Sequence, residues 1–525
     1  AGVLVSTFHA LGRHILAEHA EETGRTPGFL VAGEHDRLEL VSRAAGRGAA
    51  ERWVRRVSEA KRDLLDPDRL DPQTAGVLRR YEALLAGADA FDLDDLVAVP
   101  ARLLRSCPAL ARAYRERFRW VLIDEYQDIN RAQYELIRAL APGPRANLFV
   151  IGDPNQAIYG FRGADPRYID RFLEDYPGAA VYALEHGYRC SSPIFQASRG
   201  LLEGPGHRVP AGGRAGAVLE PAGRSGGEGP LVRIVSHRSD RSEAEFVART
   251  IEQLMGGLRF FSMDSAVSGG EETDWSLQDF AVLCRLREQM DPAREAFRNH
   301  GIPCQPVDTE PFYRKEPACF LADLLAWAAS PRNPLPGKRL ERYGIAVGED
   351  PPRLATGPVR ENARRLAVTY LGAQPDPEGL LERFYGLCVE FGEDLQAMLR
   401  FLETGTGEDT YRLGLEEVSL LTLHASKGLE FRCVFILGCE EGIIPCTLPG
   451  RKADPDEERR LLYVGMTRAR ELLVLNHADR RVLYGREMRL PRSRLVDGIL
   501  EQLEAQRPAA PASSSRRGDG QMELF

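Results

Sequence analysis

Two short apolar runs that each end in polar residues constrain the fold of this chain most strongly. Residues 120–123 lead into two acids, residues 148–151 lead into a Gly-Asp pair, and residues 131–141 between them have a helical pattern. Such runs are typical of buried parallel strands joined by a covering helix. The carboxyl ends of parallel strands are where α/β sheets bind ligands. The sequence therefore predicts an α/β fold with polar residues gathered at one edge of a sheet.

The composition narrows the class of protein. A chain of 525 residues with 43% hydrophobic and 28% charged residues fits a globular protein of about two to four domains. No stretch approaches the roughly 20 apolar residues of a membrane span. The 9 cysteines have no metal-type spacing, so we expect reduced thiols in a cytoplasmic protein. A net charge of −8 argues against a uniformly basic nucleic-acid coat but allows a locally basic groove.

The α/β pattern returns in the second half of the chain, separated by segments of other kinds. Strands are predicted at 231–235, 280–284, 418–423, 433–437 and 472–475, with helices at 242–255 and 455–469. A short strand at 3–5 and a helix at 7–19 begin the chain. Residues 36–117 and 313–411 have helical patterns, and residues 202–230 are predicted to form an exposed loop. The segment 506–520 is predicted to be disordered.

The acids after the first strand are candidates for phosphate chemistry. Asp124 could hold Mg²⁺, usually through water, and Glu125 could orient or deprotonate a water molecule that attacks a γ-phosphate. A strand that merely ends in two solvated acids is the alternative interpretation, and the pair alone does not decide between them.

The end of the second strand adds a possible sensor and a stacking surface. Gln156 offers a neutral amide that can detect a γ-phosphate without repelling it. Tyr159, Phe161 and Arg162 follow directly, and aromatic side chains offer stacking faces to single-stranded bases. An amphipathic core segment is the alternative. A sensor joined to aromatic residues within a few positions suits a motor, because hydrolysis must move the grip on DNA.

Five long strings in this sequence resemble the ordered motifs of the UvrD/Rep/PcrA-like superfamily 1 DNA helicases. They are TFHALGRHIL, LIDEYQDIN, IGDPNQAIYGFRGA, LTLHASKGLEF and EERRLLYVGMTRAR, and they run in the family's order from residue 7 to residue 470. The resemblance implies two RecA-like parallel-sheet motor domains, each with a helical insertion. It also implies ATP and Mg²⁺ as cofactors and single-stranded DNA, with its junctions to duplex, as partner.

The resemblance also implies roles for single residues. In the nucleotide site it implies Asp124 as the Mg²⁺ ligand, Glu125 as catalytic base, Gln156 as γ-phosphate sensor, Arg189 and Arg468 as the two arginines that reach the γ-phosphate, and Tyr188, Lys427, Gly428 and Glu430 beside the nucleotide. On single-stranded DNA it implies Phe8, His9, Tyr159, Phe161, Arg162, Thr422 and His424. Lys427 could equally reach a DNA phosphate. It is one of only 5 lysines, since 64 of the 69 basic residues are arginines.

Several positions depart from the family pattern. Gly187 replaces the usual Asn before Tyr-Arg, and Phe161 replaces the usual Trp before Arg-Gly-Ala. No G-x-x-x-x-G-K-[ST] phosphate loop occurs, and the nearest string, at 336–339, lacks its first glycine, its hydroxyl and a preceding strand. The family places this loop upstream of the TFH string, which here begins at Thr7. A chain shortened at its N-terminus is the expected explanation.

We therefore predict the motor of an ATP-dependent 3′→5′ DNA helicase or translocase of repair or replication. We expect residues 1–525 alone not to hydrolyse ATP. A non-catalytic DNA-binding module that has lost its phosphate loop is the alternative, and a helicase–nuclease subunit is a second. The predicted domains are 1–16 with 90–192 for the first motor domain, 17–89 for its insertion, 193–312 with 412–500 for the second motor domain, 313–411 for its insertion, and 501–525 for a tail.

The last five residues, 521–525, resemble the short peptide that binds the bacterial sliding clamp. Gln521 could hydrogen-bond at a pocket rim, and Met522, Leu524 and Phe525 supply apolar anchors. A frayed terminus with a chance apolar end is the alternative. The preceding Pro/Ala/Ser-rich segment cannot build a core, so it would leave the peptide free to reach a partner.

Overall fold

The structure is a computed structural model. It describes residues 2–46, 50–184, 186–203, 220–221, 232–256, 274–307, 311–331, 334–345, 350–372, 376, 379–405, 411–412, 414–447 and 454–505. Most of the predicted loop at 202–230, the predicted disordered segment and the clamp-like peptide lie outside these residues. No helix in the described ranges combines the length and the apolar character that crossing a membrane would need.

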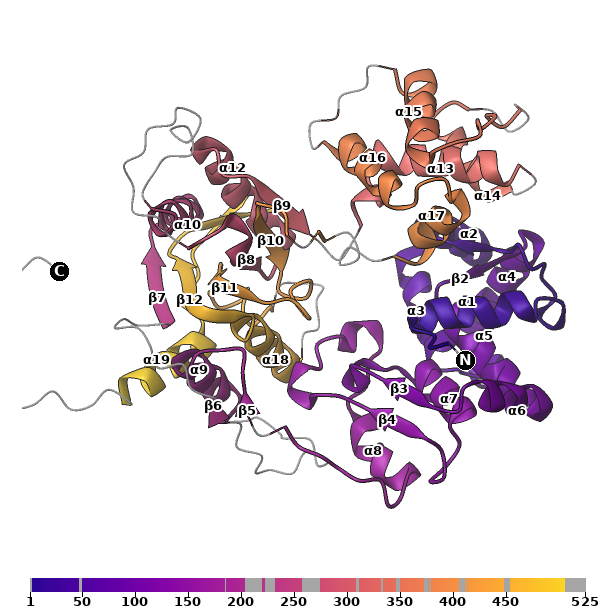
Figure 1. Cartoon of the computed structure of the whole chain (residues 1–525), viewed down its shortest axis with the longest axis horizontal. Coiled ribbons are helices and arrows are strands. Elements are labelled where there is room, and N and C mark those ends of the chain that lie inside the picture. Colours follow the sequence, from indigo (N-terminus) through magenta and orange to yellow (C-terminus); the bar gives the residue numbers. More distant parts are fainter. Residues whose placement is uncertain are drawn as a thin grey trace, which may run out of the picture.

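A parallel sheet of six strands forms the core of the second half of the chain (Figure 1). Its strands, in spatial order, are β7 (Val232–His237), β12 (Ala469–Ala478), β11 (Phe431–Ile436), β8 (Phe280–Cys284), β10 (Val418–Thr422) and β9 (Cys304–Val307). The central strands β8 and β10 are buried along their whole length, as continuous apolar runs require. This sheet confirms the predicted α/β fold.

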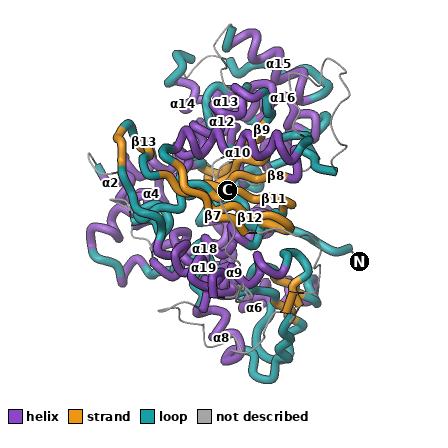
Figure 2. The backbone as a smooth tube through the Cα atoms, turned by 90° about the vertical axis from the view of Figure 1, so that its left-hand side faces the viewer, coloured by secondary structure: helices purple, strands orange, loops and turns teal. Residues whose placement is uncertain are grey.

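Helices cover both faces of this sheet, which Figure 2 shows as strands between two helical layers. One face packs against α9 (Ser192–Glu203), α18 (Pro455–Met466) and α19 (Arg494–Ala505). The other packs against α10 (Asp240–Leu254) and α12 (Met290–His300). Two short pairs, β13 (Arg481–Leu483) with β14 (Arg486–Met488) and β5 (His186–Gly187) with β6 (Glu220–Pro221), lie outside it.

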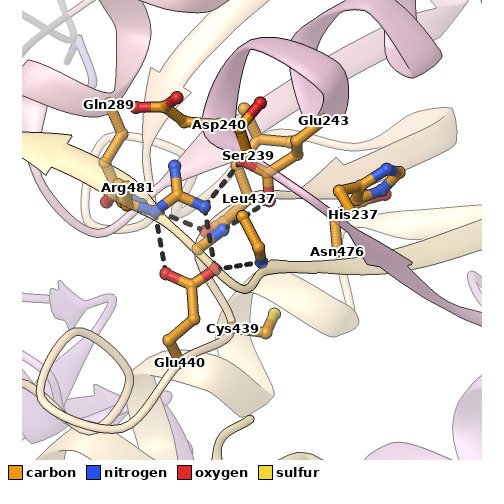
Figure 3. Close-up of polar contacts among 12 residues, drawn as sticks. His237, Ser239, Asp240, Glu243, Gln289, Leu437, Cys439, Glu440, Asn476 and Arg481 are labelled. Atoms are coloured by element: carbon orange, nitrogen blue, oxygen red, sulfur yellow. Dashed lines mark hydrogen bonds and ion pairs between the residues drawn. The ribbon is translucent and has the colours of Figure 1, made fainter. Parts of the chain in front are cut away.

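A buried ion network fixes the ends of β11 and β12 against α10 (Figure 3). Arg481 is almost fully buried and donates hydrogen bonds to both Glu440 oxygens at 2.8 Å and to Glu243 Oε2 at 2.7 Å. Burial raises the pKa of Glu243 to about 7, although Arg481 opposes this shift. Both acids also accept backbone N–H groups, from Gly438 and Ala478. The network is therefore structural, since its charged groups are already satisfied within the protein.

The first half of the chain contains a smaller sheet. Two parallel strands, β3 (Val121–Ile123) and β4 (Leu148–Val150), pair beside α7 (Arg131–Leu140). The surrounding helices are α1 (Phe8–Glu18), α5 (Asp95–Ser106), α6 (Pro108–Arg117) and α8 (Arg167–Asp175). The predicted strand at 3–5 is wrong: these residues form no strand in the structure, and Val3 and Val5 are exposed.

The helical patterns predicted at 36–117 and 313–411 are confirmed. The two helical segments within the predicted insertions, 17–89 and 313–411, touch each other (Figure 1). The first contains α2 (Glu34–Ala45), α3 (Ala50–Arg62) and α4 (Pro72–Gly87), with an unpredicted strand pair, β1 (Leu30–Ala32) and β2 (Ala90–Asp92). The second contains α13 (Ala318–Ala329), α14 (Pro334–Glu341), α15 (Val359–Tyr370), α16 (Leu380–Glu390) and α17 (Leu395–Thr404). Arg339 joins them, with ion pairs to Asp36 at 2.6 Å and to Asp323 at 2.7 Å.

Candidate nucleotide and DNA site

The acids after β3 lie at the carboxyl end of the small sheet, as predicted. Asp124 and Glu125 are exposed, and Glu125 has a left-handed backbone with φ of 52°. Gln127, which sequence reasoning missed, is fully buried beneath them. Its amide donates to Glu125, and its Oε1 accepts the N–H of Asp153 at 3.0 Å. Gln127 therefore ties the ends of β3 and β4 together and orients the Glu125 carboxylate.

A glycine is needed where the second strand ends. A Cβ atom on Gly152 would lie 2.8 Å from Gln127 Oε1, which is too close for any side chain. The chain then turns through Pro154, and Gln156 Nε2 donates to Asp153 Oδ2 at 2.8 Å. The predicted sensor amide is thus held next to the acidic strand ends, and it is only partly buried.

Lys427 joins the two motor halves at this point. Its ammonium group makes an ion pair with Asp128, lies 3.3 Å from Glu125 Oε2, and donates to the backbone carbonyl of Gln156 at 2.8 Å. The side chain is only 6% exposed. The sequence placed Lys427 beside a phosphate; in the structure its described partners are carboxylates and a carbonyl, and Gly428 follows it with φ of +84°. Nucleotide contact by Lys427 stays a prediction.

The two predicted arginines approach the same region from different elements. Arg189 forms an ion pair with Glu430 at 2.8 Å, and both side chains are partly exposed. Tyr188, beside it, is 82% exposed and lies outside the cluster. Arg468 is 1% exposed and donates to the carbonyls of Val464 at 2.9 Å and Leu429 at 3.1 Å.

The electrostatics of Arg468 favour the binding of an anion. Within the described ranges it forms no ion pair, although buried arginines are usually paired. Burial, and next the like charge of Arg189, lower the pKa of Arg468 to about 10. Two guanidinium groups held near each other against their repulsion form a site that a multivalent anion would stabilise.

The aromatic residues gather on the other side of the Gln156 segment. Phe161 is 59% exposed, and its ring lies 5.2 Å from the ring of His424, at 80°. Tyr159 lies 6.1 Å from Phe161, and the Arg162 guanidinium sits over both rings at 5.1 and 5.6 Å. An exposed ring flanked by a cation matches the side chains that stack on single-stranded bases.

The remaining predicted DNA residues are less exposed. Phe8 packs into the core around α1 and α7, and burial is the main cause that lowers the pKa of His9, with Arg162 adding to it. His9 is therefore neutral at physiological pH. Thr422 is buried, and its hydroxyl accepts the N–H of Ala425 at 3.2 Å. The structure brings His424 to the aromatic residues but gives Thr422 a turn-forming role.

Two further residues connect the segment that carries the aromatic residues to α18, and sequence reasoning missed both. Glu457 Oε1 accepts the N–H of Gly160 at 3.0 Å, and Arg460 Nε donates to the carbonyl of Ala157 at 2.8 Å. A Cβ on Gly160 would lie 2.6 Å from Glu457. Both residues belong to the EERRLLYVGMTRAR string. Their position on the helix that leads to Arg468 is the sequence feature that could have identified them.

Known proteins match this arrangement over most of the chain. A family model described as the UvrD/REP helicase N-terminal domain matches residues 1–177, and one described as the UvrD-like helicase C-terminal domain matches residues 182–343 and 382–480. The chain belongs to the UvrD/REP helicase family. The two models together cover both sheets and the segments that carry the clustered arginines, acids and aromatic residues of this UvrD/REP-type chain.

Individual relatives agree with this family. The ATP-dependent DNA helicase PcrA of Leuconostoc citreum is 28% identical over 95% of this chain and 75% of its own length. PcrA of Staphylococcus aureus strain Mu50 is 28% identical over 95% of this chain and 76% of its own. PcrA of Staphylococcus epidermidis is 28% identical over 98% of this chain and 79% of its own.

Proposed function

We propose that this UvrD/REP-family protein is an ATP-dependent DNA helicase that moves on single-stranded DNA. The observation that carries the proposal is the segment from Asp153 to Arg162. One end holds the Gln156 amide beside the acidic strand ends, and the other presents Phe161 against His424. A short rigid segment that touches a phosphate site and a base-stacking site can link hydrolysis to movement. The family match does not favour the non-catalytic alternative.

The ATP chemistry is assigned to residues of this chain as follows. Asp124 would hold Mg²⁺, which neutralises phosphate charge, and Glu125 would orient or deprotonate the attacking water. Among the described residues, no group of three or more His, Cys, Asp or Glu side chains could hold a metal ion. Magnesium would thus take its other ligands from phosphate and water, as it usually does. Gln156, Arg189 and Arg468 would contact the γ-phosphate.

The phosphate loop is the part of the site that residues 1–525 do not contain, and the small sheet offers a surface for it. Leu122 is 69% exposed, Phe149 53% and Trp120 72%, although parallel sheets are normally covered on both faces. A two-stranded sheet of three-residue strands is marginal by itself. We propose that a strand–loop–helix unit carrying the phosphate loop packs here.

More detailed proposals for this helicase follow from the family pattern. We propose 3′→5′ movement, action in repair or replication at junctions of single-stranded and duplex DNA, and a cytoplasmic location. The domain boundaries given above are also retained as proposals: the helical segments 17–89 and 313–411 are insertions into the two motor domains.

Phe161→Ala is expected to weaken binding of single-stranded DNA by about 1–3 kcal/mol, because a base loses its stacking face. Phe161→Tyr keeps the ring and should bind nearly as wild type does. Fluorescence anisotropy with a labelled oligothymidylate measures both. If the alanine variant keeps wild-type affinity, Phe161 does not stack on bases and the proposed DNA site is wrong.

We also propose that the C-terminal peptide tethers the helicase to a sliding clamp, which would raise its local concentration on replicating DNA. A peptide of residues 506–525 is expected to bind purified bacterial sliding clamp with a Kd in the micromolar range. The same peptide with Leu524→Ala and Phe525→Ala should not bind, because the apolar anchors are gone. Calorimetric titration compares the two; negligible binding by both would exclude the tether.

A further inference from the structure

A pocket of about 310 Å³ lies where the first helical segment meets the first motor domain. Its charged lining consists of Arg69, Arg105, Arg131 and one carboxylate, Asp66, and three leucines complete the wall. The arginines come from three separate elements: the turn after α3, the last turn of α5 and the first turn of α7. Nothing in the proposed ATP chemistry or base stacking uses this pocket.

The charges of the three pocket arginines are not neutralised by acidic side chains of the described residues. All three are exposed, and within the described ranges none of them makes an ion pair. The neighbouring Arg79, by contrast, pairs with Asp68. The single acid of the pocket is already engaged, because Asp66 Oδ1 accepts the N–H of Asp68 at 3.0 Å. The pocket therefore has an excess of positive charge in a chain whose net charge is −8.

A strained backbone shapes one wall of the pocket. Leu64, directly after α3, has φ of 51°, a left-handed conformation that costs a non-glycine residue about 1–2 kcal/mol. Its N–H donates to the Lys61 carbonyl at 3.0 Å, and the N–H of Leu65 donates to the Ala60 carbonyl at 2.9 Å. This turn ends α3 and carries the chain toward Arg69. The strained residue, Leu64, is itself part of the pocket wall.

Two contacts link the elements of the pocket to the segment that carries the aromatic residues. Arg62, two residues before Leu64, lies within 3.5 Å of a Cβ position on Gly163, which directly follows Phe161 and Arg162. On the other side, the N–H of Asp165 donates to the Ile129 carbonyl at 3.1 Å, just before Asn130 caps the helix that begins with Arg131. These contacts connect the segment that carries Phe161 and Arg162 to the elements that carry Arg69 and Arg131, although Arg62 itself lies 4.0 Å from Asp94 Oδ1.

We infer that this pocket binds phosphodiester groups of the DNA backbone beyond the bases held at Phe161. Arginine is suited to phosphate oxygens because its planar group donates several hydrogen bonds in fixed directions. The leucines offer an apolar surface to the sugars between phosphates. The inference rests on the proposed function and deepens it, since it extends the DNA path from the motor domain onto the base of its helical insertion.

The test compares the 525-residue chain with a variant carrying Arg69→Ala, Arg105→Ala and Arg131→Ala. Anisotropy is measured with oligothymidylates of about 6 and about 20 nucleotides, spanning the range of single-strand site sizes, and with a duplex bearing a single-stranded tail. We expect the variant to bind the long oligonucleotide at least about 10-fold more weakly. Its plot of log K against log salt should lose about 0.7 in slope per phosphate contact removed. Binding of the short oligonucleotide should not change.

Matched variants make the result specific. Replacing Arg241, Arg298 and Arg486 by alanine removes the same charge from exposed positions of the second motor half and should leave both affinities unchanged. Lysine at the three pocket positions should restore most of the salt slope. If only the tailed duplex loses affinity, the bound phosphates belong to duplex DNA. Wild-type affinity and slope for both long ligands would overturn the inference, while a loss in Phe161→Ala alone would leave the proposed function intact.

Discussion

Replacing Arg468 with alanine, in a longer helicase that carries its phosphate loop, is expected to lower ATP turnover by about 10³-fold or more, as loss of arginine fingers does. The same is expected of Arg189→Ala. Arg189 forms an ion pair with Glu430, and Arg468 is buried without an anionic partner in the described part of the chain. The charge of Arg468 is therefore available to a transferring phosphoryl group, whereas Arg189 would exchange Glu430 for the phosphate. ATP affinity should change much less, because this charge acts mainly in the transition state.

Steady-state turnover with saturating single-stranded DNA measures the effect. Arg470→Ala is the matched control: this arginine is exposed, two residues beyond Arg468, and its removal should leave turnover near wild type. Arg468→Lys should recover little, because a lysine ammonium cannot reproduce the planar donor geometry. Near-normal turnover in Arg189→Ala or Arg468→Ala would show that the residue concerned is structural.

The second large effect concerns the phosphate loop. The chain of residues 1–525 is expected to show no DNA-stimulated ATP hydrolysis above background, since it contains no loop of backbone N–H groups, lysine and hydroxyl to hold the phosphates. Adding a strand–loop–helix unit from a relative ahead of residue 1 should give turnover on the order of 1–10³ per second, the ordinary range for enzymes. A coupled phosphate-release assay measures both proteins.

A control separates the loop's chemistry from mere coverage of the exposed sheet. The added unit with its loop lysine changed to alanine should still shield Leu122 and Phe149 and raise thermal stability, yet it should not restore turnover. The active protein should unwind a duplex with a 3′ tail and not one with a 5′ tail. Robust hydrolysis by residues 1–525 alone would show that another part of this chain holds the phosphates.

The elements that the sequence predicted well are those whose local pattern and tertiary role agree. Strand β8 was predicted at 280–284 and occupies Phe280–Cys284, because a fully buried strand must be a continuous apolar run. The pair β1 and β2 was missed, since its strands have three residues each and lie 60 positions apart, at Leu30 and Ala90. The strand at 3–5 was over-predicted because apolar β-formers pair only where a neighbouring strand is available.

For the site, too, local sequence patterns predicted some residues and could not predict others. The acids, Gln156 and the aromatic residues were found because they follow strands whose ends meet at one edge. The partners of Lys427 were not, because the two contacts that define it join residues about 300 positions apart, and no periodicity records such a contact. Gln127 was missed for a different reason: a buried amide beneath two acids resembles an ordinary polar residue in a turn.

Helix α18 gives the motor a mechanical property. It is 12 residues long, about 18 Å at the usual rise per residue, and seven of its residues are buried. Near the start of α18, Glu457 and Arg460 hydrogen-bond to the backbone of the segment that carries Phe161. Thr467 and Arg468 directly follow the end of α18. Under the proposed function, α18 would therefore transmit a displacement of the Arg468 guanidinium by a phosphate to the segment that carries the proposed DNA-stacking rings.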